Sequence, residues 1–221
     1  MKASPILAGL LLFFVLLLSE LVPLKLVNAA DADPLLDFCV GDITKDLYLN
    51  GYPCKKPTAV TTDDFVFHGL TVPPQTNNSF GADAIGGSVD NFPGLNSLGI
   101  SIARLDFAKG GLIPPHTHPR ASEIIYVVEG SLYAGFVTAD NKLFAKIINK
   151  GDVMIFPRGL IHFQLNVADA PAQAVVSLNS QSPGFQFIAN SMFGSNIKDE
   201  VLQKTFFLDQ KTVDRLKAIF S

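Results

Sequence analysis

The sequence has no tryptophan, only two cysteines and only four histidines among its 221 residues. Charged side chains are also scarce, at 17% of the residues, and they form neither a lysine- or arginine-rich patch nor an acidic tail. The net charge of −3 argues against a nucleic-acid partner, because proteins that bind nucleic acids carry a basic surface. With eighteen phenylalanines and no tryptophan, the aromatic content favours a phenylalanine-rich core over a sugar-stacking surface.

Residues 1–29 have the pattern of a secretory signal peptide. Lys2 gives the segment a positively charged start, and the apolar run over 6–18 is shorter than the roughly 20 residues that a membrane-spanning helix needs. Cleavage after Ala29, in the sequence Val-Asn-Ala, fits best. A retained signal anchor is the alternative. We therefore expect a cleaved leader, a secreted mature chain over 30–221 and no integral membrane association.

Cys39 and Cys54 form an even pair, close together in a chain that is expected to be secreted. Such a pair predicts one disulfide, whereas two free thiols or a metal-binding pair suit an oxidising compartment less well. Asn77 begins the N-glycosylation acceptor Asn-Asn-Ser, and the surrounding proline and asparagine residues predict an exposed loop. The mature chain is therefore expected to carry one disulfide and a glycan at Asn77.

Three of the four histidines stand with a glutamate in two short segments, GGLIPPHTHPRASEIIYVVEG and KGDVMIFPRGLIHFQLN. Imidazole nitrogens combined with one carboxylate oxygen suit manganese, iron, zinc or copper. Four protein ligands around an octahedral metal would leave two positions open for water or substrate, as a catalytic site requires. The predicted ligands are His116, His118, Glu123 and His162.

Strand periodicity explains how these residues meet. Residues two apart in a strand point to the same face, so His116 and His118 are placed to bind one ion. Pro114 and Pro115 cannot donate to a neighbouring strand, which places the pair at a strand entrance or an edge. The alternative for an isolated His-x-His pair is an accident of strand composition.

His162 lies in a second β-rich run, over 160–166. Gln164 follows two residues later and shares its face, so its amide is placed to contact a metal-bound water. We therefore assign Gln164, as a prediction, the orientation of metal-bound solvent.

Short apolar runs alternate with turn residues along most of the chain, which predicts an all-β sandwich or barrel. Near the end the hydrophobic period moves towards that of a helix, over 196–205 and 209–220, with Asp209 as the N-cap of the last helix. No internal repeat or second domain is evident. The predicted strands are 98–107, 113–118, 123–129, 131–138, 143–148, 153–156, 160–166 and 172–179.

Two complete spacing patterns resemble the motifs of the cupin superfamily. The first is Gly110, five residues, His116-x-His118, four residues, Glu123, six residues, Gly130. The second is Gly151, five residues, Pro157-x-Gly159, two residues, His162, three residues, Asn166. The sequences DFCV, PPHTHPRASE and FPRGLIHFQ are, more narrowly, similar to those of plant germins and germin-like proteins, and this resemblance covers the mature chain from about residue 30.

The resemblance implies a single cupin domain over 30–221, an all-β jelly-roll barrel with C-terminal α-helices and Mn²⁺ inside near one mouth. It also implies that the C-terminal helices pack between subunits, giving a homo-oligomer, most simply a hexamer. The implied location is the apoplast or cell wall, with possible cell-wall association.

Two functions are compatible with this resemblance. The first is a manganese superoxide dismutase that produces hydrogen peroxide. The second is a non-catalytic cell-wall glycoprotein, or a receptor-like protein that binds a small carboxylate such as auxin. The same four ligands serve both functions, so the sequence leaves open whether the protein is an enzyme.

Oxalate oxidase activity is not expected. Germins that oxidise oxalate carry two asparagines facing the site, one just before the arginine that matches Arg104 and one just before the Pro-Pro-His sequence. Here those positions are Ala103 and Ile113, whose side chains donate no hydrogen bond to a dicarboxylate.

Overall fold

The computed structural model describes residues 36–47 and 50–220. The predicted signal peptide, residues 1–29, lies outside the described residues. None of the helices in the described part of the chain is long and apolar enough to cross a membrane.

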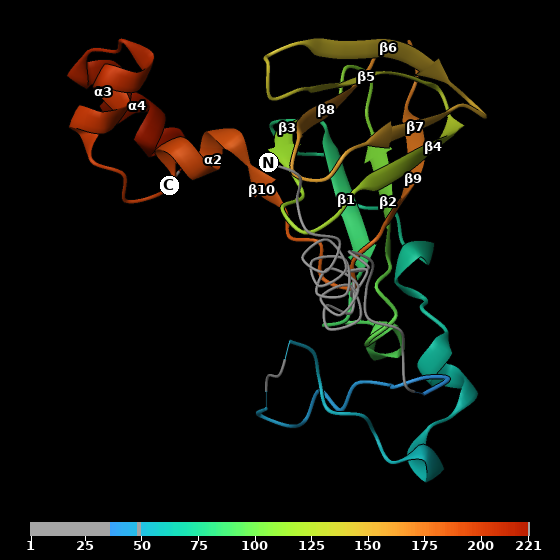
Figure 1. Ribbon diagram of the computed structural model, residues 1–221. Coiled ribbons are helices and arrows are strands. Elements are labelled where there is room, and N and C mark those ends of the chain that lie inside the picture. The colour runs from blue at the N-terminus through green and yellow to red at the C-terminus, as the bar shows by residue number, and fades with distance from the viewer. Residues whose placement is uncertain (1–35, 48–49, 221) are drawn as a thin grey trace, which may run out of the picture. The chain divides into compact units, whose positions relative to one another are not determined.

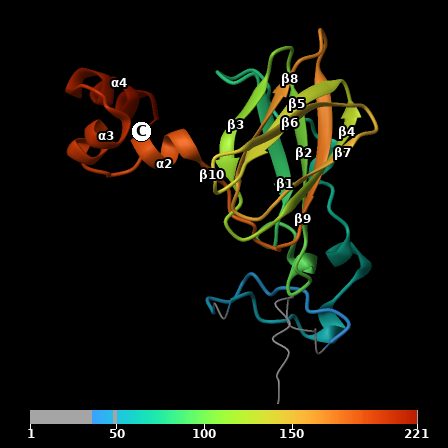
Figure 2. The ribbon, with the colours of Figure 1, turned by 45° about the horizontal axis from the view of Figure 1, so that its top comes forward.

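Two antiparallel five-stranded sheets face each other and form the predicted jelly-roll (Figures 1 and 2). The first sheet has the order β1 (Ala82–Gly87), β2 (Ser101–Phe107), β9 (Ala172–Leu178), β4 (Glu123–Glu129) and β7 (Val153–Phe156). The second has the order β10 (Gln186–Phe187), β3 (Leu112–Thr117), β8 (Ile161–Asn166), β5 (Ser131–Val137) and β6 (Leu143–Asn149).

The core lies between the sheets, because side chains alternate between the two faces of each strand. In β4, for example, Ile125 and Val127 are fully buried while Ile124 and Tyr126 are exposed. Strand register aligns the inward residues in rows. In the first sheet these rows are Ser101, Leu178 and Glu123, then Ala103, Val176 and Ile125. In the second they are His116, His162 and Phe136, then Ile113, Gln164 and Ala134.

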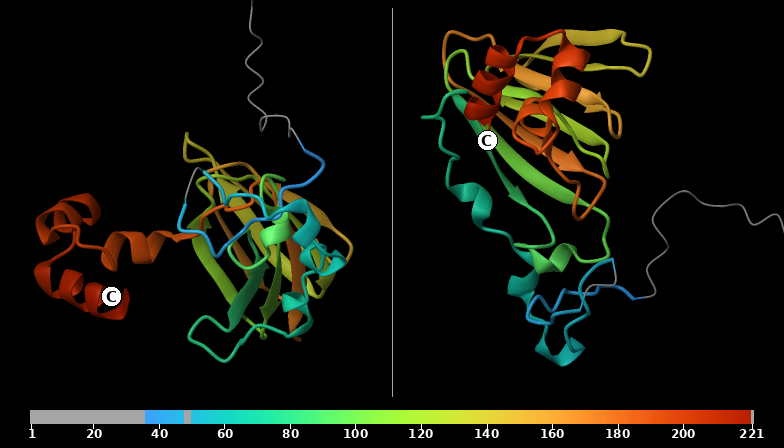
Figure 3. Two further views of the ribbon diagram at one scale, coloured as in Figure 1. Left: turned by 90° about the horizontal axis from the view of Figure 1, so that it is seen from below. Right: turned by 90° about the vertical axis from the view of Figure 1, so that its left-hand side faces the viewer.

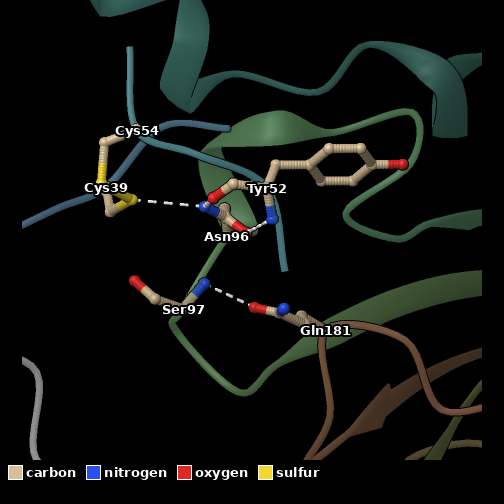
Figure 4. Close-up of a disulfide and its surroundings, with 6 residues drawn as sticks. All are labelled: Cys39, Tyr52, Cys54, Asn96, Ser97 and Gln181. Atoms are coloured by element: carbon tan, nitrogen blue, oxygen red, sulfur yellow. Dashed lines mark hydrogen bonds between the residues drawn. A yellow bond between two sulfur atoms is a disulfide. The ribbon is translucent and has the colours of Figure 1, made fainter. Parts of the chain in front are cut away.

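The segment before the barrel is held by the predicted disulfide, which the structure contains between Cys39 and Cys54 (Figure 4). The buried amide of Asn96 lies beside it, donating to Cys39 Sγ at 3.3 Å and to the Tyr52 carbonyl at 2.8 Å. The next residue, Ser97, donates its N–H to the side chain of Gln181, so this segment is tied to the chain that follows β9. Short 3-10 helices lie in the same segment at Pro57–Ala59, Thr62–Phe65 and Gly69–Thr71, and another, Pro93–Leu95, lies between β1 and β2.

The C-terminal helices stand to one side of the barrel, beyond β10 (Figures 1 and 3). They are α2 (Ile188–Phe193), α3 (Asp199–Phe206) and α4 (Gln210–Phe220). The predicted N-cap is present, since Asp209 accepts a 2.7 Å hydrogen bond from the N–H of Thr212. We call the segment from α2 to α4, residues 188–220, the helical arm. Its most exposed apolar side chain is Phe207, which is 95% exposed.

The predicted strands and the last helix agree with these bounds to within a few residues. The helix predicted over 196–205 begins at Asp199 and ends at Phe206. β1, β10 and α2 were not singled out, because each is short and lacks a clear period. In β1 the two glycines, Gly86 and Gly87, interrupt the apolar alternation.

Candidate metal centre

The four predicted ligands meet inside the barrel, and they come from both sheets. His116 lies in β3 and His162 opposite it in β8, whereas Glu123 is the first residue of β4 in the other sheet. His118 follows directly after β3. All four residues are buried, and one ligand atom from each lies within 4.8 Å of the others. The structure thus brings the predicted set together.

A bulge in β3 sets the positions of the two neighbouring histidines. The register between β3 and β8 shifts between Ile113 and His116, where Pro114 and Pro115 stand. On the other side of β3, β10 pairs only with His116 and Thr117. The prolines, which have no N–H to donate, therefore lie where β3 has no pairing partner on that side, as the edge prediction required.

Backbone carbonyls orient all three imidazoles in the same way, because each ring turns its Nδ1 towards a carbonyl oxygen. Because a carbonyl oxygen can only accept, each Nδ1 must carry the proton, and in the neutral ring each Nε2 presents its lone pair to the centre. This arrangement is the usual support for a histidine that binds a metal. The acceptors are the carbonyls of Pro114, at 2.8 Å from His116, of Leu160, at 2.9 Å from His162, and of Gly184, bonded to His118.

The carboxylate of Glu123 completes the group. Its Oε2 lies 2.9 Å from Nε2 of His118 and 3.6 Å from Nε2 of His162. Burial pushes the pKa of Glu123 up, but the neighbouring rings of His118 and His162 outweigh burial and lower that pKa to about 2. Glu123 is therefore ionised at physiological pH.

His116 stays neutral for a different reason. Burial and the repulsion of His162 lower the pKa of His116 to about 3, against the opposing effects of the Pro114 carbonyl and of Glu123. Moreover, Nε2 of the buried His162 has no hydrogen-bond partner among the described residues. Imidazole nitrogens that converge beside one carboxylate, one of them an orphaned buried atom, fit a divalent cation of the manganese-to-zinc series.

Aromatic rings cover the imidazoles. Phe156 is stacked against His162, and Phe185 lies 4.6 Å from the ring of His116 and 5.4 Å from that of His118, measured between centroids. Phe185, unlike Phe156, is half-exposed to solvent. The two sides of the group therefore differ, because one faces the core and the other lies beside a half-exposed ring at the surface.

A cavity of about 640 Å³ reaches the group from this surface. His116, His118 and Glu123 line it, together with Phe185. Its deeper wall is apolar and consists of Ala103, Leu105, Ile113, Val176 and Leu178. Ala103 and Ile113, the two positions at which the sequence resemblance predicts a loss of hydrogen-bond donors, are both part of that wall.

Gln164 lies in the row beneath His162, opposite Ile113 and Ala134. It is fully buried, and neither atom of its amide has a hydrogen-bond partner in the part of the chain described. Such an amide is costly to bury unless something binds it. This placement agrees with the predicted role of Gln164 towards solvent at the centre, which stays a prediction.

The sequence analysis did not find Phe185, Phe156 or the Gly184 carbonyl. Their contacts are non-local: Gly184 lies 66 residues beyond His118. A proline-glycine pair at 183–184 indicates a turn, but no local pattern shows which histidine that turn contacts. Asn77, the predicted glycan acceptor, is in an exposed loop as expected.

Comparisons with known proteins agree with this geometry. The profile of the cupin family matches residues 68–214. Germin-like protein 8-2 of Oryza sativa subsp. japonica is 52% identical over 198 residues, covering 87% of this chain and 90% of that protein. Germin-like protein subfamily 2 member 1 of Arabidopsis thaliana is 46% identical over 207 residues, covering 93% and 94%. A solved oxalate oxidase structure superimposes with a TM-score of 0.84 at 40% identity, covering 87% of this chain and 98% of that one.

Proposed function

The chain belongs to the germin-like proteins of the cupin family, and on that premise we propose that it is a secreted manganese superoxide dismutase that releases hydrogen peroxide in the apoplast. One observation carries the proposal: three histidines and one glutamate converge in the barrel, with ligand atoms within 4.8 Å of one another, beside a cavity. Secretion is supported by the leader pattern over 1–29.

His116, His118, Glu123 and His162 would hold the ion. Manganese bound there would supply one-electron redox chemistry through its divalent and trivalent states, and the balanced reaction converts two superoxide ions and two protons into oxygen and hydrogen peroxide. Glu123 would offset part of the metal charge, while neutral imidazoles leave the remainder to attract an anion. Manganese binds weakly in the series of divalent metals, so loading would depend on supply and geometry.

Gln164 is the residue we propose to position solvent. Its buried amide offers two N–H donors and one carbonyl acceptor, and none has a partner among the described residues. A water held by this amide would lie at the depth of the apolar wall, where no other side chain of its row is polar: the neighbours are Ile113 and Ala134.

Oxalate oxidase activity is not part of the proposal. Ala103 and Ile113 give the cavity wall no donor for a dicarboxylate. Losing two charge-assisted hydrogen bonds costs about 3–6 kcal/mol, at roughly 1.5–3 kcal/mol each. Superoxide needs only access to the ion. Hydrogen peroxide release from oxalate at the rate of an oxalate-oxidising germin would contradict this part.

We propose further that the mature protein is a homo-oligomer, most simply a hexamer, held by the helical arm. Three apolar side chains of the arm are more than half exposed: Phe207, Ile219 and Val201. Apolar surface of this kind on an element that projects from the barrel is typical of subunit contacts. The arm lies beside the barrel rather than folding back over it (Figure 3).

A second candidate is a non-catalytic wall glycoprotein or a receptor for a small carboxylate, and the cavity favours it. A volume of about 640 Å³ is far larger than superoxide needs and suits an organic ligand. The hydroxyl of Ser101 lines this cavity, is buried and has no partner in the described residues. Ser101 and Glu123 flank Leu178 in one row, so their Cα atoms are two strand spacings, or roughly 10 Å, apart.

One experiment separates the two functions. Protein purified from its native source should contain manganese, and it should dismutate superoxide until a chelator removes the metal and again after manganese is restored. A manganese-replete protein without dismutase activity that binds aryl carboxylates would favour the receptor. Protein with no metal above trace would refute both metal-dependent functions.

A further inference from the structure

One half-exposed side chain, Phe185, covers two of the ligands where they meet the cavity. His116 and His118 are only 2% and 7% exposed, whereas Phe185, whose ring lies over both, is 50% exposed. Phe187 supports this ring from the side, with centroids 4.5 Å apart and planes at 85°. Phe185 therefore occupies the boundary between the open part of the cavity and two of the ligands.

The loop that carries Phe185 is held by Arg120, a residue of the PPHTHPRASE sequence that the metal centre itself does not use. Its Nε donates to the Ser182 carbonyl at 2.6 Å, and its Nη2 lies 3.2 Å from the Ser182 hydroxyl. The backbone N–H of Arg120 donates to the Pro183 carbonyl at 3.1 Å. The loop is thus bound to Arg120 through both side chain and backbone.

Gly184 connects the loop held by Arg120 to the metal centre. Its carbonyl accepts the Nδ1 proton of His118, and its φ is +70°. A Cβ at this position would lie 3.2 Å from both terminal nitrogens of Arg120. The left-handed backbone and the close guanidinium both favour glycine here. The same short loop therefore orients one ligand and places the ring that covers two.

We propose that Phe185 determines what reaches the metal: it admits diatomic and triatomic anions and excludes larger chelating molecules, and Arg120 is the positioning residue that keeps it there. The proposal rests on the metal site of the proposed function. It goes beyond that function and opposes the second candidate, because a ring that admits only diatomic and triatomic anions would keep an organic carboxylate from the ion.

The kinetics of metal removal test the exclusion. In the manganese-loaded protein, release to EDTA should proceed at a rate that does not depend on EDTA concentration, because the chelator cannot reach the bound ion. In Phe185→Ala the rate should rise in proportion to EDTA concentration, and Phe185→Leu should fall between. Phe65→Ala is the matched control, since Phe65 is 43% exposed, packs edge-on against Phe38 and lies away from the cavity.

Release from the wild type that is already proportional to EDTA concentration would overturn the proposal. So would a Phe185→Ala protein whose release stays independent of EDTA.

Histidine labelling tests the screen without a metal, so it separates this proposal from the proposed function. Metal-free protein is treated with diethyl pyrocarbonate, and each histidine peptide is followed by mass spectrometry. His68, which is exposed, gives the reference rate. The peptide with His116 and His118 should react slowly in the wild type and approach the His68 rate in Phe185→Ala, while His162, covered by Phe156, should change less. Equal rates in wild type and variant would refute the screen, even in a protein that binds no manganese.

The role of Arg120 has its own readout. Arg120→Lys keeps the positive charge but loses the planar guanidinium that bonds Ser182. Both Arg120→Lys and Arg120→Ala should therefore increase the EDTA dependence of metal release and the labelling of His118. If Arg120→Lys behaves as the wild type, charge rather than the planar guanidinium matters, and the positioning role is wrong.

Discussion

Phe156 lies nearly parallel to the imidazole of His162, with ring centroids 4.5 Å apart and planes inclined by 16°. Phe156 is fully buried and pairs with Glu123 across β7 and β4. One apolar residue thus lies beside two ligands that come from different sheets.

We predict that Phe156→Ala destabilises the metal-free protein by about 3–5 kcal/mol, the usual cost of removing a buried ring. Phe156→Leu keeps most of the volume and should cost much less, so any loss of metal affinity that both variants share is due to the lost stacking. Urea unfolding and metal titration measure the two effects. A metal-free Phe156→Ala protein as stable as the wild type would show that this row of the core is loosely packed.

Replacing His118 by Ala should remove most of the bound metal and leave the barrel folded, because strand burial dominates the core. Loss of an outer hydrogen-bond partner already costs roughly 10–100-fold in metal affinity, and loss of a direct ligand should cost more. Elemental analysis after dialysis and circular dichroism check the two parts. His68→Ala, outside the group, is the control, and a His118→Ala protein with the metal content of the wild type would rule out the ligand assignment.

Acid should destabilise the metal-free protein from about pH 6.5 downward. His116 has a folded pKa of about 3 against an ordinary value of 6.5. Between these two pH values the unfolded chain binds a proton at His116 and the folded chain does not. The free energy of unfolding therefore decreases by about 1.4 kcal/mol for each unit by which the pH is lowered. Glu123, with its pKa lowered from 4.5 to about 2, adds a loss of the same sign between those values.

Urea titrations at several pH values measure this slope. In His116→Gln the part of the loss between pH 6.5 and 4.5 should shrink, because the titrating group is gone. Metal-free wild-type protein with constant stability between pH 6.5 and 5 would contradict the prediction.

Removing the disulfide should cost about 3 kcal/mol on the chain-entropy model, since it closes a loop with a sequence separation of 15. The double variant Cys39→Ser, Cys54→Ser should therefore unfold at lower urea concentration, and a reducing agent should affect only the wild type. A non-reduced digest should show the two cysteine peptides linked. Two freely alkylated cysteines in the mature protein would refute the bond.

Phe207→Ser should weaken assembly while changing monomer stability by no more than about 0.5 kcal/mol, because a side chain that is 95% exposed contributes little to its own fold. An aromatic anchor at an interface contributes about 2 kcal/mol or more. Sedimentation over a dilution series compares the variant with Lys211→Ser, an exposed position on α4. A wild-type monomer at micromolar concentration would end the oligomer proposal, and deletion of 207–221 should weaken assembly further.

Most of the barrel could be predicted from sequence because its strands alternate strongly and end at turn residues. The spacing of His116, His118, Glu123 and His162 sufficed for the ligand group, since the two-residue period of a strand and a short turn fix where these side chains point. β1 was not identified, because Gly86 and Gly87 replace the apolar alternation that identifies a strand.

The surroundings of the site could not be predicted in the same way. The hydrogen-bond partners of the imidazoles are backbone carbonyl groups, which every residue has. The pattern of side chains therefore does not indicate that His118 bonds the carbonyl of Gly184. Phe185 is one of eighteen phenylalanines, and only the return of the chain after β9 brings it over the histidines.

Glu123 belongs to one sheet, whereas His116 and His162 belong to the other, and His118 directly follows a strand of that second sheet. A bound ion would therefore link the two sheets. Sliding of one sheet against the other would move Glu123 relative to the three histidines and would disturb the coordination of the ion. Loss of the ion and loosening of the two layers should then occur together. Amide hydrogen exchange in β4 and β8 should accelerate in step when the ion is removed, although no hydrogen bond joins these two strands.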